Sequence, residues 1–205
     1  MIETGTDIVY AASLLRRGEL VAIPTETVYG LAANALDSNA VMKIYATKQR
    51  PTFNPLIVHV AETNDISRFA TNVPLNMWRL AERFSPGPLT YVLPRREIIP
   101  DVVTGGGDTV AVRVPSHPMA RELLSLLDFP LAAPSANPSG YISPVTAAHV
   151  AQELGNKIPY VLDGGECAVG LESTVVAFDG DKVVVLRAGG ITLHTAGSLK
   201  RLPFT

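Results

Sequence analysis

Cysteine is almost absent from this 205-residue chain, which has Cys167 alone alongside four histidines. A single thiol excludes an internal disulfide framework, and with scattered histidines it makes no recognisable zinc cluster. A charge excess is lacking too, because Lys and Arg total 17 against 19 for Asp and Glu. The net charge of −2 speaks against a nucleic-acid-packaging protein, which needs a cationic surface, but it is compatible with a local basic cleft.

Long hydrophobic runs are also missing. No stretch approaches the roughly 18 uninterrupted apolar residues of a membrane span, and the start, MIETGTDIVY, has no basic segment followed by an apolar one. We therefore expect a cytoplasmic chain that is neither exported nor anchored in a membrane. Internal repeats, low-complexity tracts and an interior linker are not found either, so we expect one domain over residues 1–205.

Common enzyme signatures are absent as well. The sequence has no G-x-x-x-x-G-K-[ST] and no G-x-G-x-x-G after a strand, so neither a P-loop NTPase nor a Rossmann dehydrogenase is supported. H-E-x-x-H and G-x-S-x-G are likewise missing.

Short apolar runs rich in β-branched residues alternate with segments whose apolar residues recur every three or four positions, which predicts an α/β or α+β domain. Some strands are apolar on both faces and others flank glycine turns such as FDGDK, so we expect a mixed sheet. Helices are predicted after caps at Thr6 or Asp7 and at Ser38, and over residues 75–84, 118–127 and 145–154. Strands are predicted over residues 20–23, 56–60, 89–93, 110–114, 130–133, 160–162, 174–178 and 183–186.

Two arginines interrupt the apolar pattern of these strands. Arg113 stands inside VAVRVP, and Arg187 ends VVVLRAGG just before two glycines. A buried guanidinium needs an anion, because an unpaired charge in an apolar setting is unfavourable. Each arginine therefore either binds an anionic ligand or pairs with an internal carboxylate, and the residues alone leave both interpretations open.

Polar residues also gather in PTETVYGL and KQRPTFNPL. A capping turn explains the threonines and the glutamate of the first segment without a function. A solvated helix end explains Lys48 and Arg50 in the same way, because cations are favoured there. Asn54, wedged between an aromatic residue and a proline, is harder to explain structurally. His59 inside LIVHV is either a neutral core histidine or a ligand-binding one.

Two further segments, APSANPSGYISP and GLESTVV, are rich in hydroxyl groups. Such loops can surround an anion with backbone N–H groups and hydroxyls, although plain surface loops have a similar composition. Together with Lys48, Arg50, Arg113 and Arg187, they predict a concave site for a polyanion and a smaller polar co-substrate. A nucleoside triphosphate fits that description.

These segments occur in a fixed order: PTETVYGL, KQRPTFNPLIVHV, SPGPLTYVL, TVAVRVP, APSANPSG, GLESTVV and LRAGGIT. In that order the chain resembles the YrdC-like threonylcarbamoyl-AMP synthases over about residues 20–192, and it includes the family's K-x-R and S-x-N pairs at Lys48, Arg50, Ser135 and Asn137. The resemblance implies an L-threonylcarbamoyladenylate synthase, a nucleotidyltransferase that forms threonylcarbamoyl-AMP and pyrophosphate from L-threonine, bicarbonate or CO2, and ATP. A downstream transferase complex would then modify tRNA to threonylcarbamoyladenosine, while tRNA binding by this chain itself would be weak or indirect.

The resemblance also implies roles for single residues. Lys48 and Arg50 would be catalytic, and Mg²⁺ would be held by the ATP phosphates rather than by protein ligands. Arg113 would hold the carboxylate of threonine. Contacts to L-threonine are implied for Thr27, His59, Arg113, the backbone at Ala133, and Ser173. Contacts to ATP are implied for Arg50, Asn54, Thr109, Ser135, Asn137, Ser143 and Arg187.

The implied fold is a twisted mixed β-sheet flanked by helices, with a concave electropositive active-site face. Longer members of the family add a C-terminal domain through a linker that can close over the site, whereas this sequence stops soon after LRAGGIT, so we expect a single-domain form without that lid. The family often has proline where Ala188 stands, and losing proline's fixed φ is expected to loosen Arg187 and its ATP contact.

Other functions remain open at this point. An RNA-binding module of the same fold would use shape and phosphate contacts, but the net charge of −2 argues against strong binding. A sister enzyme that activates carbamoyl phosphate normally has zinc-binding and acylphosphatase segments, which this sequence lacks. A paralogue with a different carbamoylated substrate is opposed, but not excluded, by the intact K-x-R and S-x-N pairs.

Overall fold

A ten-stranded sheet forms the centre of the molecule, and the computed structural model describes residues 2–180 and 182–191. Thr192, where the family resemblance ends, lies outside the described residues. The strands are β1 (Glu3–Gly5), β2 (Val21–Ile23), β3 (Gly30–Asn34), β4 (Ile57–His59), β5 (Leu89–Pro94), β6 (Thr109–Arg113), β7 (Leu131–Ala132), β8 (Tyr160–Leu162), β9 (Thr174–Asp179) and β10 (Lys182–Arg187). The helices are α1 (Ile8–Arg16), α2 (Ser38–Lys48), α3 (Ile66–Phe69), α4 (Leu75–Phe84), α5 (Asp101–Thr104), α6 (Pro118–Ser125) and α7 (Ala147–Leu154), with 3₁₀ turns η1 (Thr63–Asp65) and η2 (Gly155–Lys157).

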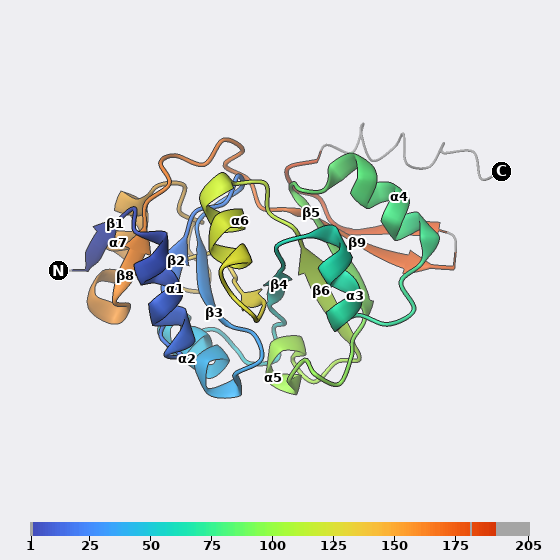
Figure 1. Cartoon of the computed structure of the whole chain (residues 1–205), viewed down its shortest axis with the longest axis horizontal. Helices are drawn as coiled ribbons and strands as arrows, with labels where there is room; N and C mark the ends of the chain where they lie inside the picture. Colours follow the sequence, from blue (N-terminus) through green and yellow to red (C-terminus); the bar gives the residue numbers. More distant parts are fainter. Residues whose placement is uncertain (1, 181, 192–205) are drawn as a thin grey trace.

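The sheet mixes parallel and antiparallel neighbours in the order β1-β8-β2-β3-β7-β4-β6-β5-β9-β10. β4 runs parallel to β6 and β5 parallel to β9, whereas β2–β3, β5–β6 and β9–β10 are antiparallel. β9 and β10 pair on either side of the predicted FDGDK turn. The mixed sheet flanked by helices that the sequence predicts is therefore confirmed (Figure 1). The electropositive character of a concave face stays a prediction.

The long helices lie where the apolar periodicity predicts them, with one correction at a cap. Asp7 caps α1, since its carboxylate accepts a hydrogen bond from the Tyr10 N–H. At α2 the cap is Asp37, not Ser38, because the Asp37 carboxylate accepts hydrogen bonds from two N–H groups of the first turn. Ser38 is instead the first residue of the helix.

The sequence pattern does not predict β1, β3, α3 or α5. β3 matters most, because four of the five residues of its sequence GLAAN, namely Gly, Asn and two Ala, are of types depleted in strands. It is a strand because β2 and β7 pair with it on its two sides. As a result, PTETVY becomes a six-residue connection between two antiparallel neighbours, and its polar residues lie at one end of the sheet.

Two helix layers cover the half of the sheet that contains β2, β3 and β8. On one face α1 and α6 lie side by side, and Leu15 and Leu123 pack with Val21 and Ile23 of β2 (Figure 1). On the opposite face lie α2 and α7. Both faces of β2 are thus buried, which explains why its sequence is apolar throughout.

The other half of the sheet uses its two faces differently. Val110 and Val112 of β6 are buried in the core, on the same side as α4 and α5. The alternate residues of β6, Thr109, Ala111 and Arg113, line a cavity on the other face. Strand alternation therefore divides one short sequence between the core and a candidate site.

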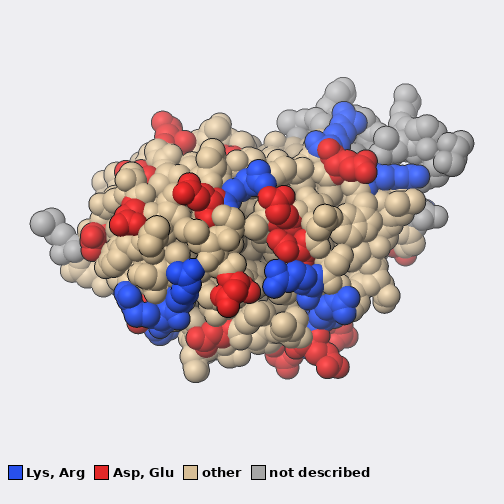
Figure 2. Space-filling model, in the orientation of Figure 1, with Lys and Arg blue, Asp and Glu red and all other residues tan. Residues whose placement is uncertain are grey.

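Surface features add two observations. On the face that carries α1 and α6, Lys and Arg side chains are interspersed with Asp and Glu rather than gathered by sign (Figure 2). None of the helices within the described ranges has the length and apolarity needed to cross a bilayer.

Candidate active site

A cavity of about 500 Å³ opens on the face of the sheet to which Thr109, Ala111 and Arg113 of β6 point. Nine of the thirteen predicted site residues line it. Its floor comes from β4, β6, β9 and β10, and its walls come from the loops after β2 and β7 and before β9. The predicted residues in the lining are Thr27, Arg50, His59, Thr109, Arg113, Ala133, Ser135, Ser173 and Arg187. All five predicted threonine contacts are among them.

Three polar side chains form a row across β4, β6 and β5, and the first two, His59 and Arg113, line the cavity. His59 on β4 is paired in register with Arg113 on β6, which is paired in register with Thr90 on β5. Residues paired in register point to the same face of a sheet, so the three side chains lie next to one another. Thr90 is fully buried, and its hydroxyl lies 2.8 Å from the hydroxyl of Ser173. Thr90 is not among the predicted site residues, because threonine is common in strands and gives no signal of a function.

Arg113 is buried and held from three directions. Its Nη2 donates to Glu26 Oε1 at 2.6 Å, its Nη1 to Thr27 Oγ1 at 3.0 Å, and its Nε to the Gly87 carbonyl at 3.2 Å. The second carboxylate oxygen of Glu26 accepts from the Ser116 N–H. A guanidinium has five N–H groups, so among the described residues one N–H on each Nη is left for a ligand.

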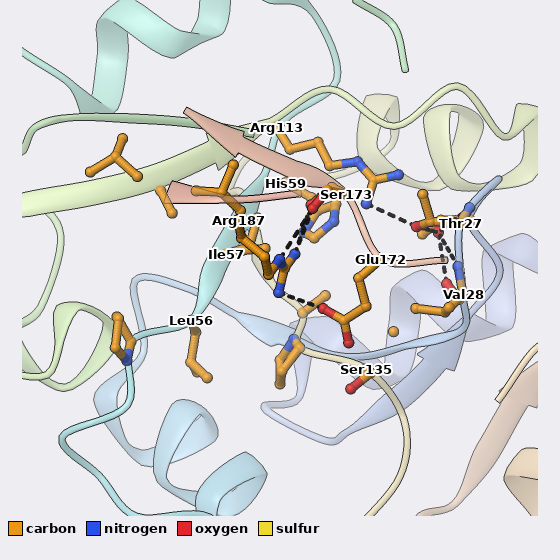
Figure 3. Close-up of a pocket in the computed structure, with 18 of the residues that line it drawn as sticks. Thr27, Val28, Leu56, Ile57, His59, Arg113, Ser135, Glu172, Ser173 and Arg187 are labelled. Carbon is orange, nitrogen blue, oxygen red and sulfur yellow. Dashed lines mark hydrogen bonds and ion pairs between the residues drawn. The ribbon is translucent and has the colours of Figure 1, made fainter. Parts of the chain in front are cut away.

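Arg187 is more exposed than Arg113, and it lies at the edge of the same cavity (Figure 3). Its Nη1 donates to Glu172 Oε2 at 2.6 Å, and its Nη2 donates to the carbonyl and the hydroxyl of Ser173. The side chains of Arg187 and Glu172 are 42% and 37% exposed. The interpretation that each arginine pairs with an internal carboxylate is thus confirmed for both, and yet both also line the cavity.

The two glycines after Arg187 have a packing reason. A Cβ on Gly189 would lie 2.2 Å from the Glu172 carbonyl oxygen, and the Gly190 N–H donates to that same carbonyl at 2.8 Å. Only glycine allows this approach of the two backbones. The segment after β10 is thereby fixed against the one before β9, which keeps Arg187 beside Glu172. The loosening expected from Ala188 stays a prediction.

Lys48 lies beneath the cavity rather than in its lining. It is 1% exposed, so the interpretation of Lys48 as part of a solvated helix end is wrong. Its ammonium donates to the carbonyls of Ser135 and Asn137. Burial, and to a lesser extent the positive charge of Arg50, lowers the pKa of Lys48 to about 8. Lys48 thus holds the loop that carries Ser135 into the site.

Three other predicted residues support the lining without forming it. Asn137 is buried and donates to the carbonyls of Pro138 and Tyr141, while its Oδ1 has no hydrogen-bond partner among the described residues. The Ser143 hydroxyl donates to Glu172 Oε1 at 3.0 Å. The Asn54 carbonyl accepts from Arg50 Nε at 3.4 Å.

Arg50 differs from the other two arginines of the cavity. Its Nη2 donates to the Pro55 carbonyl, and within residues 2–180 and 182–191 no carboxylate forms an ion pair with it. Burial lowers the pKa of Arg50, and the positive charge of Arg187 lowers it as well, whereas the charge of Glu172 raises it. Arg50, Arg187 and Glu172 thus act on one another across one side of the cavity.

His59 is the second buried titratable group of the floor. Burial and then the charge of Arg113 lower the pKa of its imidazole to about 3, so the ring is neutral near pH 7. Its Nδ1 is buried and has no hydrogen-bond partner among the described residues. The His59 residue lines the cavity, and a neutral imidazole can donate a hydrogen bond to a polar ligand there or accept one from it.

The loops of the cavity are cross-linked by backbone hydrogen bonds. The Tyr29 N–H donates to the Pro144 carbonyl and its own carbonyl accepts from Ala136, while the Gly170 N–H donates to Thr27. The three polar segments of the sequence are therefore one structural unit. Glu26 and Glu172, noted in the sequence only as part of their segments, are the carboxylates that organise it.

Comparison with known proteins gives consistent relatives. The profile of the Sua5/YciO/YrdC family, described as telomere recombination, matches residues 13–189. Two relatives named threonylcarbamoyl-AMP synthase, from Pyrococcus abyssi and Bacillus subtilis, are 52% and 48% identical over 90% of this chain and 54% of their own length. A crystal structure of Pyrococcus abyssi Sua5 complexed with L-threonine superposes with a TM-score of 0.92 at 48% identity, over 97% of this chain and 60% of that one. The chain thus spans about half the length of these relatives.

Proposed function

The chain belongs to the Sua5/YciO/YrdC family, and from this premise we propose that it is an L-threonylcarbamoyladenylate synthase. The substrates would be L-threonine, bicarbonate or CO2, and ATP, and the products threonylcarbamoyl-AMP and pyrophosphate. One observation carries the proposal. The five residues assigned to threonine and four of those assigned to ATP line a single cavity.

The threonine side of the cavity is the floor around Arg113. A guanidinium with one free N–H on each Nη can bind a carboxylate at two points. The neutral imidazole of His59 lies next to it in the sheet register, and Thr27 and Ser173 add hydroxyl groups. The related Sua5 structure holds L-threonine, which supports this assignment.

The nucleotide side is the rim formed by Arg50, Arg187, Ser135 and Thr109. Arg50 and Arg187 carry two positive charges against the one negative charge of the nearby Glu172. The resulting net positive charge suits a triphosphate. Lys48 would act through the loop of Ser135 and Asn137, because its ammonium is already bonded there. Mg²⁺ brought with ATP would be held by the phosphates and would neutralise part of their charge. Glu172 is the carboxylate on this rim.

The reaction needs no enzyme nucleophile. The amine of threonine adds to CO2 and loses a proton, which gives a carbamate, and a carbamate oxygen attacks the α-phosphorus of ATP while pyrophosphate leaves. The protein would position both substrates and offset the charge that accumulates on the phosphates, and such preorganised donors are usually the largest catalytic term. The walls of the cavity would limit the entry of water, which decomposes carbamates and acyl adenylates.

The product would pass to a transferase complex that modifies tRNA, with tRNA contacts by this chain weak or indirect. We place the reaction in the cytoplasm and assign it to one catalytic domain over residues 1–205.

Pyrophosphate release tests the proposed function. It should require ATP, L-threonine and bicarbonate together, and it should fall at least a hundredfold in Arg113→Met combined with Glu26→Gln. The double variant removes both charges of the buried pair, so it avoids leaving one unpaired. Arg121→Ala, which breaks a surface pair with Glu62, is the matched control and should retain full release. Release that does not depend on threonine, or no release from folded wild type, would reject the proposal.

A further inference from the structure

Glu172 has no assigned part in the proposed reaction, although it occupies the nucleotide side of the cavity. Its two carboxylate oxygens accept from Arg187 Nη1 at 2.6 Å and from the Ser143 hydroxyl at 3.0 Å. Its charge also acts on Lys48 and Arg50 and raises the pKa of both. One carboxylate thus acts on four groups, of which the family resemblance assigns three, Arg187, Ser143 and Arg50, to ATP and the fourth, Lys48, to catalysis.

The same groups would be needed by the phosphates. Arg187 and Ser143 cannot offer those N–H and O–H groups to a phosphate oxygen while Glu172 holds them. A triphosphate at this rim would also bring negative charge next to the Glu172 carboxylate, which is unfavourable. Glu172 and a polyphosphate are therefore competitors for one set of donors.

The side chain of Glu172 can leave its position beside Arg187 and Ser143. Its side chain is 37% exposed, whereas that of Glu26, the other carboxylate of the site, is 10% exposed. An exposed ion pair is weak because water solvates both partners, so it can exchange partners readily. The backbone of Glu172 stays in place because its carbonyl packs against Gly189 and bonds to Gly190, so only the side chain needs to move.

We propose that Glu172 is a displaceable internal counter-ion for the phosphate side of the pocket. In the empty site it keeps Arg187 and Ser143 in position and offsets the repulsion between Arg50 and Arg187. A polyphosphate then takes over these donors and the Glu172 side chain turns to solvent. When pyrophosphate leaves, Glu172 returns, which favours its release. The identity of the ligand rests on the proposed function, but the exchange itself is a property of the pocket.

Binding of inorganic tripolyphosphate and of ATP, measured by calorimetry in EDTA, tests this exchange without catalysis. Glu172→Gln keeps the shape and removes the charge, so both ligands should bind on the order of fivefold more tightly than to wild type. Glu172→Asp keeps the charge and should stay within about twofold of wild type. Glu166→Gln is the matched control: it removes one charge from the same loop, where its side chain is exposed, and should bind as wild type does.

The outcomes separate the two proposals. If the wild type binds ATP and Glu172→Gln binds it equally well or more weakly, the counter-ion proposal is overturned. The synthase proposal then still stands. Weakening seen only when Mg²⁺ is added also overturns it, since Glu172 would then be a cation ligand. No binding of ATP or tripolyphosphate to either protein overturns both proposals. Equal tightening in Glu166→Gln would overturn the specific role of Glu172, because it would reflect net charge alone.

Discussion

The two arginine–carboxylate pairs of the cavity have the same chemistry and opposite surroundings. In the Arg113–Glu26 pair the side chains are 4% and 10% exposed, and further backbone and hydroxyl groups fix both partners. In the Arg187–Glu172 pair they are 42% and 37% exposed. A buried pair cannot lose one partner without leaving an unsolvated charge, whereas an exposed pair can. We infer that the first pair positions a small substrate, and the second exchanges its carboxylate for phosphate.

The largest expected difference concerns the buried pair. Glu26→Gln should lower the free energy of unfolding by about 3–5 kcal/mol, because Arg113 keeps its charge and loses its counter-ion. Urea denaturation at pH 7 measures it. Adding Arg113→Met should restore much of the loss, since no charge then remains buried. A loss below about 1 kcal/mol would show that burial does not distinguish the two pairs.

The second largest expected effect is a loss of stability at acid pH, which is caused by the buried His59. The pKa of His59 is about 3 when folded and about 6.5 in an unfolded chain, so below pH 6.5 the unfolded chain binds a proton that the folded protein does not. Stability therefore falls as the pH drops, by about 2 kcal/mol at pH 5. Urea denaturation of wild type and His59→Gln from pH 7 to pH 5 isolates this effect. Parallel curves for the two proteins would contradict it.

Lys48 extends the comparison to a buried cation whose hydrogen-bond partners, among the described residues, are carbonyls rather than a carboxylate. Its pKa is about 8 when folded and about 10.5 in an unfolded chain, so between these values the unfolded chain holds more protons. Stability should therefore rise with pH, by about 1 kcal/mol from pH 8 to pH 9, relative to Lys48→Met. The neutral amine keeps two N–H groups, enough for the carbonyls of Ser135 and Asn137. If the difference in unfolding free energy between the two proteins stayed constant from pH 8 to pH 9, the pKa of Lys48 in the folded protein would not be about 8.

The exposed pair should give the smallest change in stability. Glu172→Gln is expected to alter the free energy of unfolding by less than about 1 kcal/mol, because water and salt already screen both charges. The change should shrink further in 1 M NaCl. Denaturation at low and high salt measures it, with Glu62→Gln of the surface Arg121–Glu62 pair as a reference. If Glu172→Gln changed the free energy of unfolding as much as Glu26→Gln does, Glu172 would be too firmly held to exchange with a phosphate.

Much of this fold was predictable from local patterns. Apolar periodicity located the long helices, and α4 and β8 have the predicted bounds. β3 was missed because GLAAN has weak strand preference and forms a strand only through its two neighbours. The Asp37 cap was assigned one residue late, because Asp and Ser both favour that position.

The site was predictable as a set of residues rather than as an arrangement. Arg113 was noticed as a charge inside an apolar strand and Arg187 as one at a strand end, and both line the cavity. Their carboxylate partners lie 87 and 15 positions away in the chain, and no local pattern connects Glu26 with Arg113. Lys48 and Arg50, two positions apart at a helix end, have different surroundings, since one is buried among carbonyls and the other lines the cavity.

By itself the sequence determined the layers of the fold, the family resemblance and the polar residues that a site would need, because these depend on local periodicity and on residue chemistry. Only the tertiary structure decided which charges are paired and how far each pair is exposed to water. Those properties depend on contacts between strands distant in the chain and on the backbone approach of Gly189 to Glu172. Solvation, rather than residue type, separates a fixed ion pair from an exchangeable one.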